Sequence, residues 1–267
     1  MFAVELRKLL TRPRTWLTVA LLAGLPTVIA IFLKATRIGP RPGQGPALLS
    51  EVLNNGLLFP AAALGLVLPI FLPVATAVFA GDSIAGEADA GTLRYLLIRP
   101  VGRTRLLLAK LVSVTVFVFL AVLIVAGVGY VTGWLLFGVK PVASVSGSSM
   151  SYGETLLRTA ITILYIGVSM LGVAAIAMFA SSRTDSPTGA ALTALAAFIT
   201  SEVLDLVEAT RAIDPYLPTH YWLSFIDLYR TPILWHDVLR GFGVQAVYIG
   251  VFLGAAWASF STKDITS

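Results

Sequence analysis

The residues of this chain that are able to do chemistry are few, and they form no known catalytic arrangement. The sequence has neither a phosphate-binding loop of the form G-x-x-x-x-G-K-[ST] nor an H-E-x-x-H zinc motif. Its histidines, His220 and His236, stand apart in one predicted loop, where isolated histidines are more often hydrogen-bonded surface residues than ligands. Because the chain has no cysteine, disulfides and thiolate metal sites are excluded. We therefore expect no catalytic residue and no metal site.

The composition indicates a protein that is embedded in a membrane. Of the 267 residues, 57% are hydrophobic and 12% are charged, whereas soluble domains carry roughly 25% charged residues. A nucleotide-hydrolysing domain needs roughly 100 to 200 residues of its own, and no segment between the apolar runs is that long. We expect no cofactor in this chain, so any ATP and Mg²⁺ must be bound by a partner subunit. The chain itself is predicted not to be an enzyme.

Six stretches free of charge are long enough, or nearly so, to cross a bilayer, which takes about 20 apolar residues. They cover residues 16–33, 57–80, 111–137, 159–180, 188–201 and 241–260. The fifth is short, and we expect it to continue past Glu202 toward Val207. The predicted fold is an all-α membrane protein with six transmembrane helices, which form a single transmembrane domain over residues 1–267.

The basic residues predict how the chain is oriented. If the termini are cytoplasmic, Lys and Arg are about twice as dense in the inner segments as in the outer ones, which satisfies the positive-inside rule. We therefore predict a multi-pass protein of the plasma (inner) membrane with both termini cytoplasmic. A net charge of +5 would suggest a nucleic-acid partner in a soluble protein. Here it is explained by the inner segments, so no nucleic acid is expected and membrane lipid is.

The first 15 residues are predicted to form an interfacial helix in the headgroup plane. At helical spacing, apolar and charged residues fall on opposite faces, namely Phe2, Leu6, Leu9 and Leu10 on one and Glu5, Arg7, Lys8 and Arg12 on the other. The alternative is a basic flank that only sets the topology of the first span.

The second predicted span contains three prolines, Pro60, Pro69 and Pro73. Each removes a backbone hydrogen bond that lipid cannot replace. We expect this helix to bend and to bury the prolines against protein, although kinks without a role are the alternative.

Residues 202–240 are rich in aromatic side chains, which favour the membrane interface. We predict short re-entrant or surface-lying helices on the extracellular side. Glu202 and Asp205 are weak candidates for the substrate path, because charges near the bilayer mark such paths. A solvated helix end explains them equally well.

The loop at residues 81–110 is the most informative segment. Between Gly86 and Ile98 it can form a short amphipathic helix, with its leucines against the membrane protein and with Glu87, Asp89 and Arg94 facing water. Such a charged outer face suits the docking of a soluble partner. The helix should end before Pro100, and the basic residues that follow, Arg103, Arg105 and Lys110, mark the return of the chain to the membrane interface.

This loop resembles the signature of the ABC-2 type permeases, the membrane subunits of ATP-binding cassette exporters with the type V fold. The matching residues, in order, are Glu87, Gly91, Thr92, Leu93, Leu96, Leu97, Pro100, Arg103 and Lys110. The basic N-terminal helix, the six spans, the LPTHYW stretch at 217–222 and the FSTKDI run at 260–265 also look like this family.

The resemblance implies a pair of permeases, identical or related, with two ABC ATPase subunits bound beneath them. It assigns contact with the ATPase to the coupling helix between helices 2 and 3, at Glu87, Gly91, Thr92, Leu93 and Arg94, and more weakly to Glu5 and Arg7. It also implies re-entrant helices between helices 5 and 6 that close the translocation route.

The substrate does not follow from the resemblance. The uncharged spans suit export of a hydrophobic or amphipathic substrate such as a drug, lipid or peptide. One alternative is a permease of the same family that serves the maturation of copper or sulfur enzymes. Another is a membrane scaffold or enzyme that transports nothing.

Overall fold

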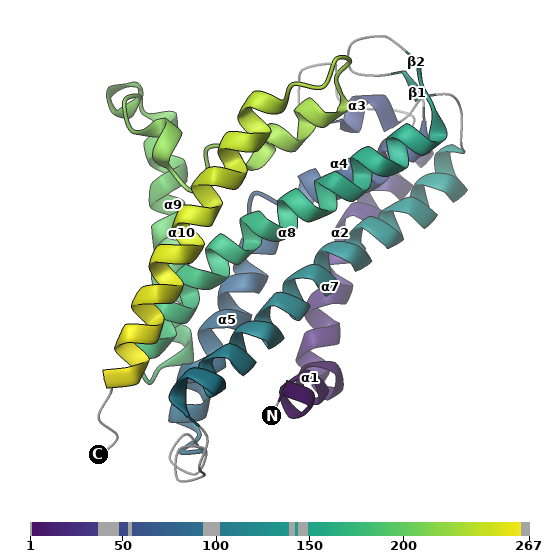
Figure 1. Cartoon of the computed structure of the whole chain (residues 1–267). Helices are drawn as coiled ribbons and strands as arrows, with labels where there is room; N and C mark the ends of the chain where they lie inside the picture. Colours follow the sequence, from purple (N-terminus) through teal and green to yellow (C-terminus); the bar gives the residue numbers. More distant parts are fainter. Residues whose placement is uncertain are drawn as a thin grey trace.

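The computed structural model describes residues 2–36, 48–52, 55–92, 102–138, 142–143 and 149–262, and these are almost entirely helical (Figure 1). The long helices are α2 (Pro13–Thr36), α5 (Phe71–Asp89), α7 (Arg103–Phe137), α8 (Tyr152–Arg183), α9 (Pro187–Leu206) and α10 (Trp235–Thr262). The shorter elements are α1 (Phe2–Thr11), α3 (Leu49–Val52), α4 (Phe59–Val67), four 3-10 helices η1 (Gly56–Leu58), η2 (Glu208–Thr210), η3 (Asp214–Tyr216) and η4 (Trp222–Tyr229), and the strands β1 (Val142–Ala143) and β2 (Ser149–Met150). The two strands form an antiparallel pair.

Five helices of the described chain are long and apolar enough to cross a membrane, namely α2, α7, α8, α9 and α10. A sixth span results if α4 and α5, which are bent against each other by 59°, are taken together. A multi-pass, all-α membrane protein is therefore confirmed, apart from the one pair of two-residue strands. The prediction that the fifth span continues past Glu202 is also confirmed, because α9 ends at Leu206.

The bend in the second span lies at residues 68–70, where helix α4 gives way to α5. The predicted bend is confirmed, and Pro60 and Pro73 are buried as expected. Pro69 is exposed, so the prediction that protein covers all three prolines is wrong there. The side chains next to Pro69 at the break, Ile70 and Phe71, are exposed as well.

Helix α8 is the centre of the bundle and the most buried of the long spans. It packs against α5, α9 and α10, while α7 packs against α2 and α4. Small residues such as Gly172 and Ala174 line its buried surface and let neighbouring helices approach closely. Rings fill the space between α5 and α7, where Phe79 stacks on Phe117 with centroids 4.1 Å apart.

The aromatic region at 202–240 contains the expected short helices, as 3-10 helices, and their re-entrant position on the extracellular side stays a prediction. Between α9 and α10 the described chain forms the 3-10 helices η2, η3 and η4, and residues 235–240 are the first turns of α10. Buried side chains fix this region to its neighbours. The Arg158 guanidinium on α8 donates to the carbonyls of Leu228 and Arg230, each at 2.7 Å. Side-chain bonds to loop carbonyls replace the regular helical pattern here, which sequence periodicity does not reveal.

The described ends of the chain lie at the same end of the bundle, as six spans require. Arg103 at the start of α7 donates to the carbonyl of Ser261 near the end of α10 at 2.7 Å. Lys8 on α1 contacts Glu87 at the end of α5. We call this the charged end of the bundle, and α1 lies there in Figure 1.

The backbones of α5 and α9 pack closely together at Gly81. A Cβ atom placed there would lie 2.9 Å from the backbone nitrogen of Ala191, closer than real Cβ contacts allow. The contact is backbone and cannot rotate away, so glycine is required at this crossing.

Replacing Gly81 with Val is therefore expected to destabilise the bundle by about 1–3 kcal/mol, the usual cost of overpacking. The measurement is thermal unfolding of the purified chain in detergent, followed by tryptophan fluorescence. Gly127→Val on α7 is the matched control, because a Cβ atom at Gly127 meets nothing within 4 Å. Equal midpoints for the two variants would contradict the close crossing.

Candidate functional site

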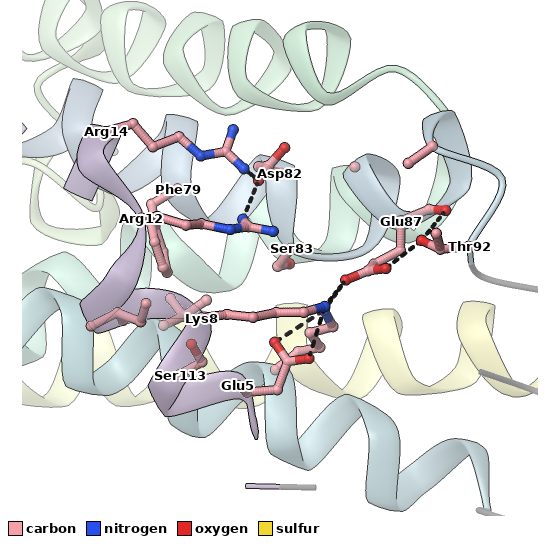
Figure 2. A pocket seen from close by; sticks show the side chains of 15 residues that line it. Glu5, Lys8, Arg12, Arg14, Phe79, Asp82, Ser83, Glu87, Thr92 and Ser113 are labelled. Carbon is pink, nitrogen blue, oxygen red and sulfur yellow. Dashed lines mark hydrogen bonds and ion pairs between the residues drawn. The ribbon is translucent and has the colours of Figure 1, made fainter. Parts of the chain in front are cut away.

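Four charged side chains from three helices meet at the charged end of the bundle, and Figure 2 labels Glu5, Lys8 and Glu87 among them. They are Glu5 and Lys8 on α1, Glu87 near the end of α5, and Lys110 on α7. The Lys110 ammonium lies 3.0 Å from Glu87 Oε1 and 3.1 Å from Glu5 Oε2. Lys8 Nζ lies 2.8 Å from Glu87 Oε1 and 3.8 Å from Glu5 Oε1. Cations and carboxylates thus alternate in a closed ring, which we call the ion ring.

The buried charges of the ion ring need partners of opposite charge. Lys110 is only 5% exposed, and Glu5 and Glu87 are 8% and 9% exposed. A charge removed from water in this way is tolerated when opposite charges and hydrogen bonds replace its hydration. The ring holds two cations and two anions and has no net charge. It therefore joins α1, α5 and α7 without leaving an uncompensated charge beside the apolar bundle.

The position of Glu87 is set by the way α5 ends. Gly91 adopts a left-handed conformation with φ of +66°, which favours glycine. The amide of Thr92 donates to the carbonyl of Glu87 and that of Gly91 to Ala88, both at 2.9 Å. This pair of bonds is a Schellman motif, which closes the last helical turn. The Thr92 hydroxyl also donates to Glu87 Oε2 at 2.5 Å, so it orients the carboxylate toward the two lysines.

A second charged group lies beside the ion ring. Arg12 and Arg14 both donate to Asp82 Oδ2, at 3.3 and 3.0 Å (Figure 2). Residues of this group and of the ion ring line one cavity of about 310 Å³. Two guanidinium groups share one carboxylate, so this group carries a net charge of +1. It ties the connection between α1 and α2 to α5.

Helix α8 reaches the same end of α5 through Ser181, whose side chain is fully buried. The Ser181 hydroxyl donates to the carbonyl of Gly81 at 2.6 Å and accepts from the amide of Ala85 at 2.8 Å. It is thus inserted into the backbone hydrogen-bond ladder of α5 just before Glu87. The end of α5 is therefore bonded to the central helix α8 as well as to α1 and α7.

The chemistry available at this site is electrostatic. The Thr92 hydroxyl donates to the Glu87 carboxylate that Lys8 and Lys110 also contact, and the Ser83 hydroxyl donates to the backbone carbonyl of Ala80 at 2.6 Å. Within the part of the chain that the structure describes, no group of three or more His, Asp or Glu could hold a metal ion. The arrangement is suited to joining helices and transmitting their displacement.

The structure brings together several residues that the sequence singled out. Glu5, Glu87 and Thr92 all line the charged cavity, and Gly91 forms the turn beside them. Arg7 lies on the exposed side of α1. Leu93 and Arg94 lie outside the described residues, as does the second half of the expected helix, residues 93–98.

Two expectations about this segment are wrong. Residues 86–89 were expected to begin a separate short helix, but they are the last turn of α5, which continues from the membrane span. Glu87 was expected to face water, but it is buried in the ion ring. Asp89, two residues on, is exposed as expected. The continuing helix rotates Glu87 toward α1 and α7, because residues two positions apart face different directions.

Sequence reasoning missed the partners of Glu87. Lys110 was expected only to mark the return of the chain to the interface, yet it is buried within α7. Its position beside an uninterrupted apolar run was the available signal, since a charge there calls for a partner. The pairing of Lys8 with Glu87 and of Arg12 with Asp82 joins segments far apart in the chain, and no local pattern predicts it.

Glu202 and Asp205 lie at the opposite end of the bundle. Asp205 Oδ1 is 2.5 Å from His220 Nδ1, and Ser201 and Thr219 exchange a hydrogen bond of 2.7 Å beside this pair. Glu202 is exposed. These contacts hold the end of α9 to the chain before η4, and the role of the two acids in a substrate path stays a prediction.

Comparison with known proteins assigns a family without an activity. A family model described as "Protein of unknown function (DUF2705)" matches residues 53–266. No curated protein matches the chain. The matched stretch includes Glu87 and Lys110 of the ion ring, whereas Glu5 and Lys8 on α1 precede it.

Replacing Glu87 with Gln is expected to lower the free energy of unfolding by about 3 kcal/mol, because Lys110 and Lys8 lose their shared carboxylate. The measurement is an unfolding titration of the purified chain in mixed micelles. Asp89→Asn is the control, since Asp89 is exposed and in no ion pair of the described residues. That variant should stay within about 0.5 kcal/mol of wild type. A Glu87→Gln protein as stable as Asp89→Asn would show that the ion ring contributes nothing.

Proposed function

The chain belongs to the DUF2705 family of proteins of unknown function, and we propose that it is the permease subunit of an ABC transporter, driven by ATPase subunits on separate chains. The multi-pass bundle and the likeness of residues 87–110 to the ABC-2 signature support this proposal. A second copy of the permease, identical or related, would complete the path. The proposed orientation places the charged end in the cytoplasm, where the ATPase works.

The observation that carries the proposal is the convergence of four residues on one junction. The resemblance assigns Glu5, Glu87, Gly91 and Thr92 to contact with the ATPase, although α1 and the end of α5 are far apart in sequence. In the described chain they surround the ion ring or the turn next to it. Such a junction is what a permease needs at the point where a partner pushes.

The ion ring explains how a push would travel. A displacement of the segment after Thr92 acts on the end of α5, which is bonded to α1 and α7 through Glu87 and to α8 through Ser181. The bend of 59° between α4 and α5 provides a place where one half of this span can tilt relative to the other. ATP binding to the partner would then shift the population of bundle arrangements and change access to the path.

The proposed cargo is a hydrophobic or amphipathic molecule. A cavity of about 820 Å³ lies between α10 and residues 215–221, within the size range of small-molecule sites. Its lining is largely apolar and aromatic, with Tyr216, Tyr248 and Phe252, and Arg240 provides one cation. This lining supports an organic cargo with one polar group over a hydrophilic ion.

We expect the tagged full chain, purified from its native membrane, to bring down an ATPase that contains a phosphate-binding loop. Gly91→Val should lower the recovered ATPase and its stimulated activity several-fold, because a β-branched residue is strained at φ of +66°. Gly102→Val is the matched control on the other side of the same segment, where φ is −56°.

Absence of any ATPase from the wild-type preparation would overturn the proposal. Unchanged coupling in Gly91→Val would remove the segment after α5 from it. An ATPase-bound chain on which copper or sulfur enzymes depend would favour the maturation role, and a solitary chain would favour a scaffold or enzyme that transports nothing.

A further inference from the structure

Two neighbouring cavities meet at the pair of arginines that hold Asp82. One is the charged cavity beside the ion ring, and the other is an apolar groove of about 290 Å³ between α2 and α5. Arg14, Phe79 and Asp82 line both of them. A polar chamber and an apolar groove therefore share one rim, which suits a ligand that is itself charged at one end and apolar along its length.

The apolar groove opens toward the bilayer. Its walls include Leu21 and Leu22 on α2, Val74 and Val78 on α5, and Phe117 on α7. Leu21 and Val78 are more than half exposed, at 67% and 53%, and in a membrane span such exposed apolar side chains face lipid. The groove is thus continuous with the hydrocarbon of the membrane.

The length of the groove corresponds to one leaflet. From Arg14 to Leu22 the α2 wall rises about 12 Å, and from Asp82 back to Phe71 the α5 wall rises about 16 Å, at about 1.5 Å per residue. Half of the roughly 30 Å hydrocarbon core is about 15 Å. The rim stands at the level of the interface, since Trp16, an exposed aromatic of the kind found there, lies in the first turn of α2.

Positive charge exceeds negative charge at the rim. The ion ring is neutral, so the local balance is set by Arg12, Arg14 and Asp82 and amounts to +1. Within the described residues each guanidinium makes one hydrogen bond, to the same Oδ2 atom. A guanidinium carries five N–H donors, so both arginines have donors left for a phosphate. Arginine favours such contacts, because two of its N–H groups can donate to one phosphate in parallel.

We propose that this groove binds an anionic phospholipid of the leaflet in which α1 lies. One acyl chain occupies the groove along α2 and α5, and the phosphate lies against Arg12 and Arg14. A zwitterionic phospholipid carries its own compensating cation and gains less from the net charge of the rim. The Asp82 carboxylate opposes this binding, because its negative charge offsets part of the positive charge that attracts the phosphate. The proposal does not depend on the transport function, since it rests on these residues alone.

Native mass spectrometry of the purified full chain tests the proposal. The protein is incubated with equal amounts of dioleoyl phosphatidylglycerol and dioleoyl phosphatidylcholine, and the ratio of the two bound lipids is measured. Wild type should retain the anionic lipid preferentially. In the double variant Arg12→Gln, Arg14→Gln the ratio of bound anionic to zwitterionic lipid should fall about tenfold, as expected for the loss of one charge-assisted hydrogen bond.

Three further variants separate binding from folding, because a ratio within one sample does not depend on the yield of folded protein. Arg105→Gln removes an exposed charge at the start of α7 and should keep the preference. Asp82→Asn removes the negative charge beside the phosphate and should raise the preference for the anionic lipid. If the arginine pair only held the helices together, the same variant would lower that preference. Val78→Trp fills the groove and should reduce the anionic lipid bound.

Three results would overturn the proposal. They are equal retention of both lipids by wild type, an unchanged ratio in the double arginine variant, or a lower ratio in Asp82→Asn. Displacement of the phosphatidylglycerol by an equal concentration of glycerol 3-phosphate would show a phosphate site without an acyl groove, and this too would overturn it.

Discussion

The buried ammonium group of Lys110 is the constraint on which the charged end of the bundle depends. Placed within α7 and almost fully covered, it needs carboxylates from outside its own helix. Glu5 comes from α1 and Glu87 from α5, and each lies about one hydrogen-bond length away. Lys8 completes the charge balance. A single desolvated cation thus fixes helix α1 and the ends of two spans in one arrangement.

The rest of the architecture makes this junction mechanically useful. The Schellman motif at Gly91 stops α5 at a defined residue, and Ser181 binds the last turns of α5 to the central helix α8. At its other end α5 meets α4 at an abrupt bend. The second span therefore has one end held by charge and a break partway along it. In the proposed coupling, this helix would tilt as a lever about the break.

The features that follow from composition and periodicity could be predicted from the sequence. A multi-pass bundle, a helix at the N-terminus and a bend near the prolines follow from runs of apolar residues and from proline chemistry, and the structure has all three, with five candidate spans or six if the bent pair is one span. The expected faces of the N-terminal helix are wrong in part, because Glu5 is buried and Leu10 is exposed. The burial of Glu87 could not be predicted, because it depends on how far α5 continues and on which helices meet its last turn. The same holds for Pro69, which is exposed although its neighbours are buried. The backbone of residues 207–234 is held by side chains of other elements, such as Arg158 on α8. Contacts of this kind leave no periodic pattern in the sequence.

The central claim is that the ion ring holds α1 against α5. The natural chain has no cysteine, so spin labels can be attached at Arg7→Cys and Asp89→Cys, both exposed positions on these helices, and their separation can be measured by double electron–electron resonance. We predict a single narrow distance distribution in the otherwise native chain and a longer, broader one when Lys110→Met is added. Identical distributions with and without Lys110 would contradict the account.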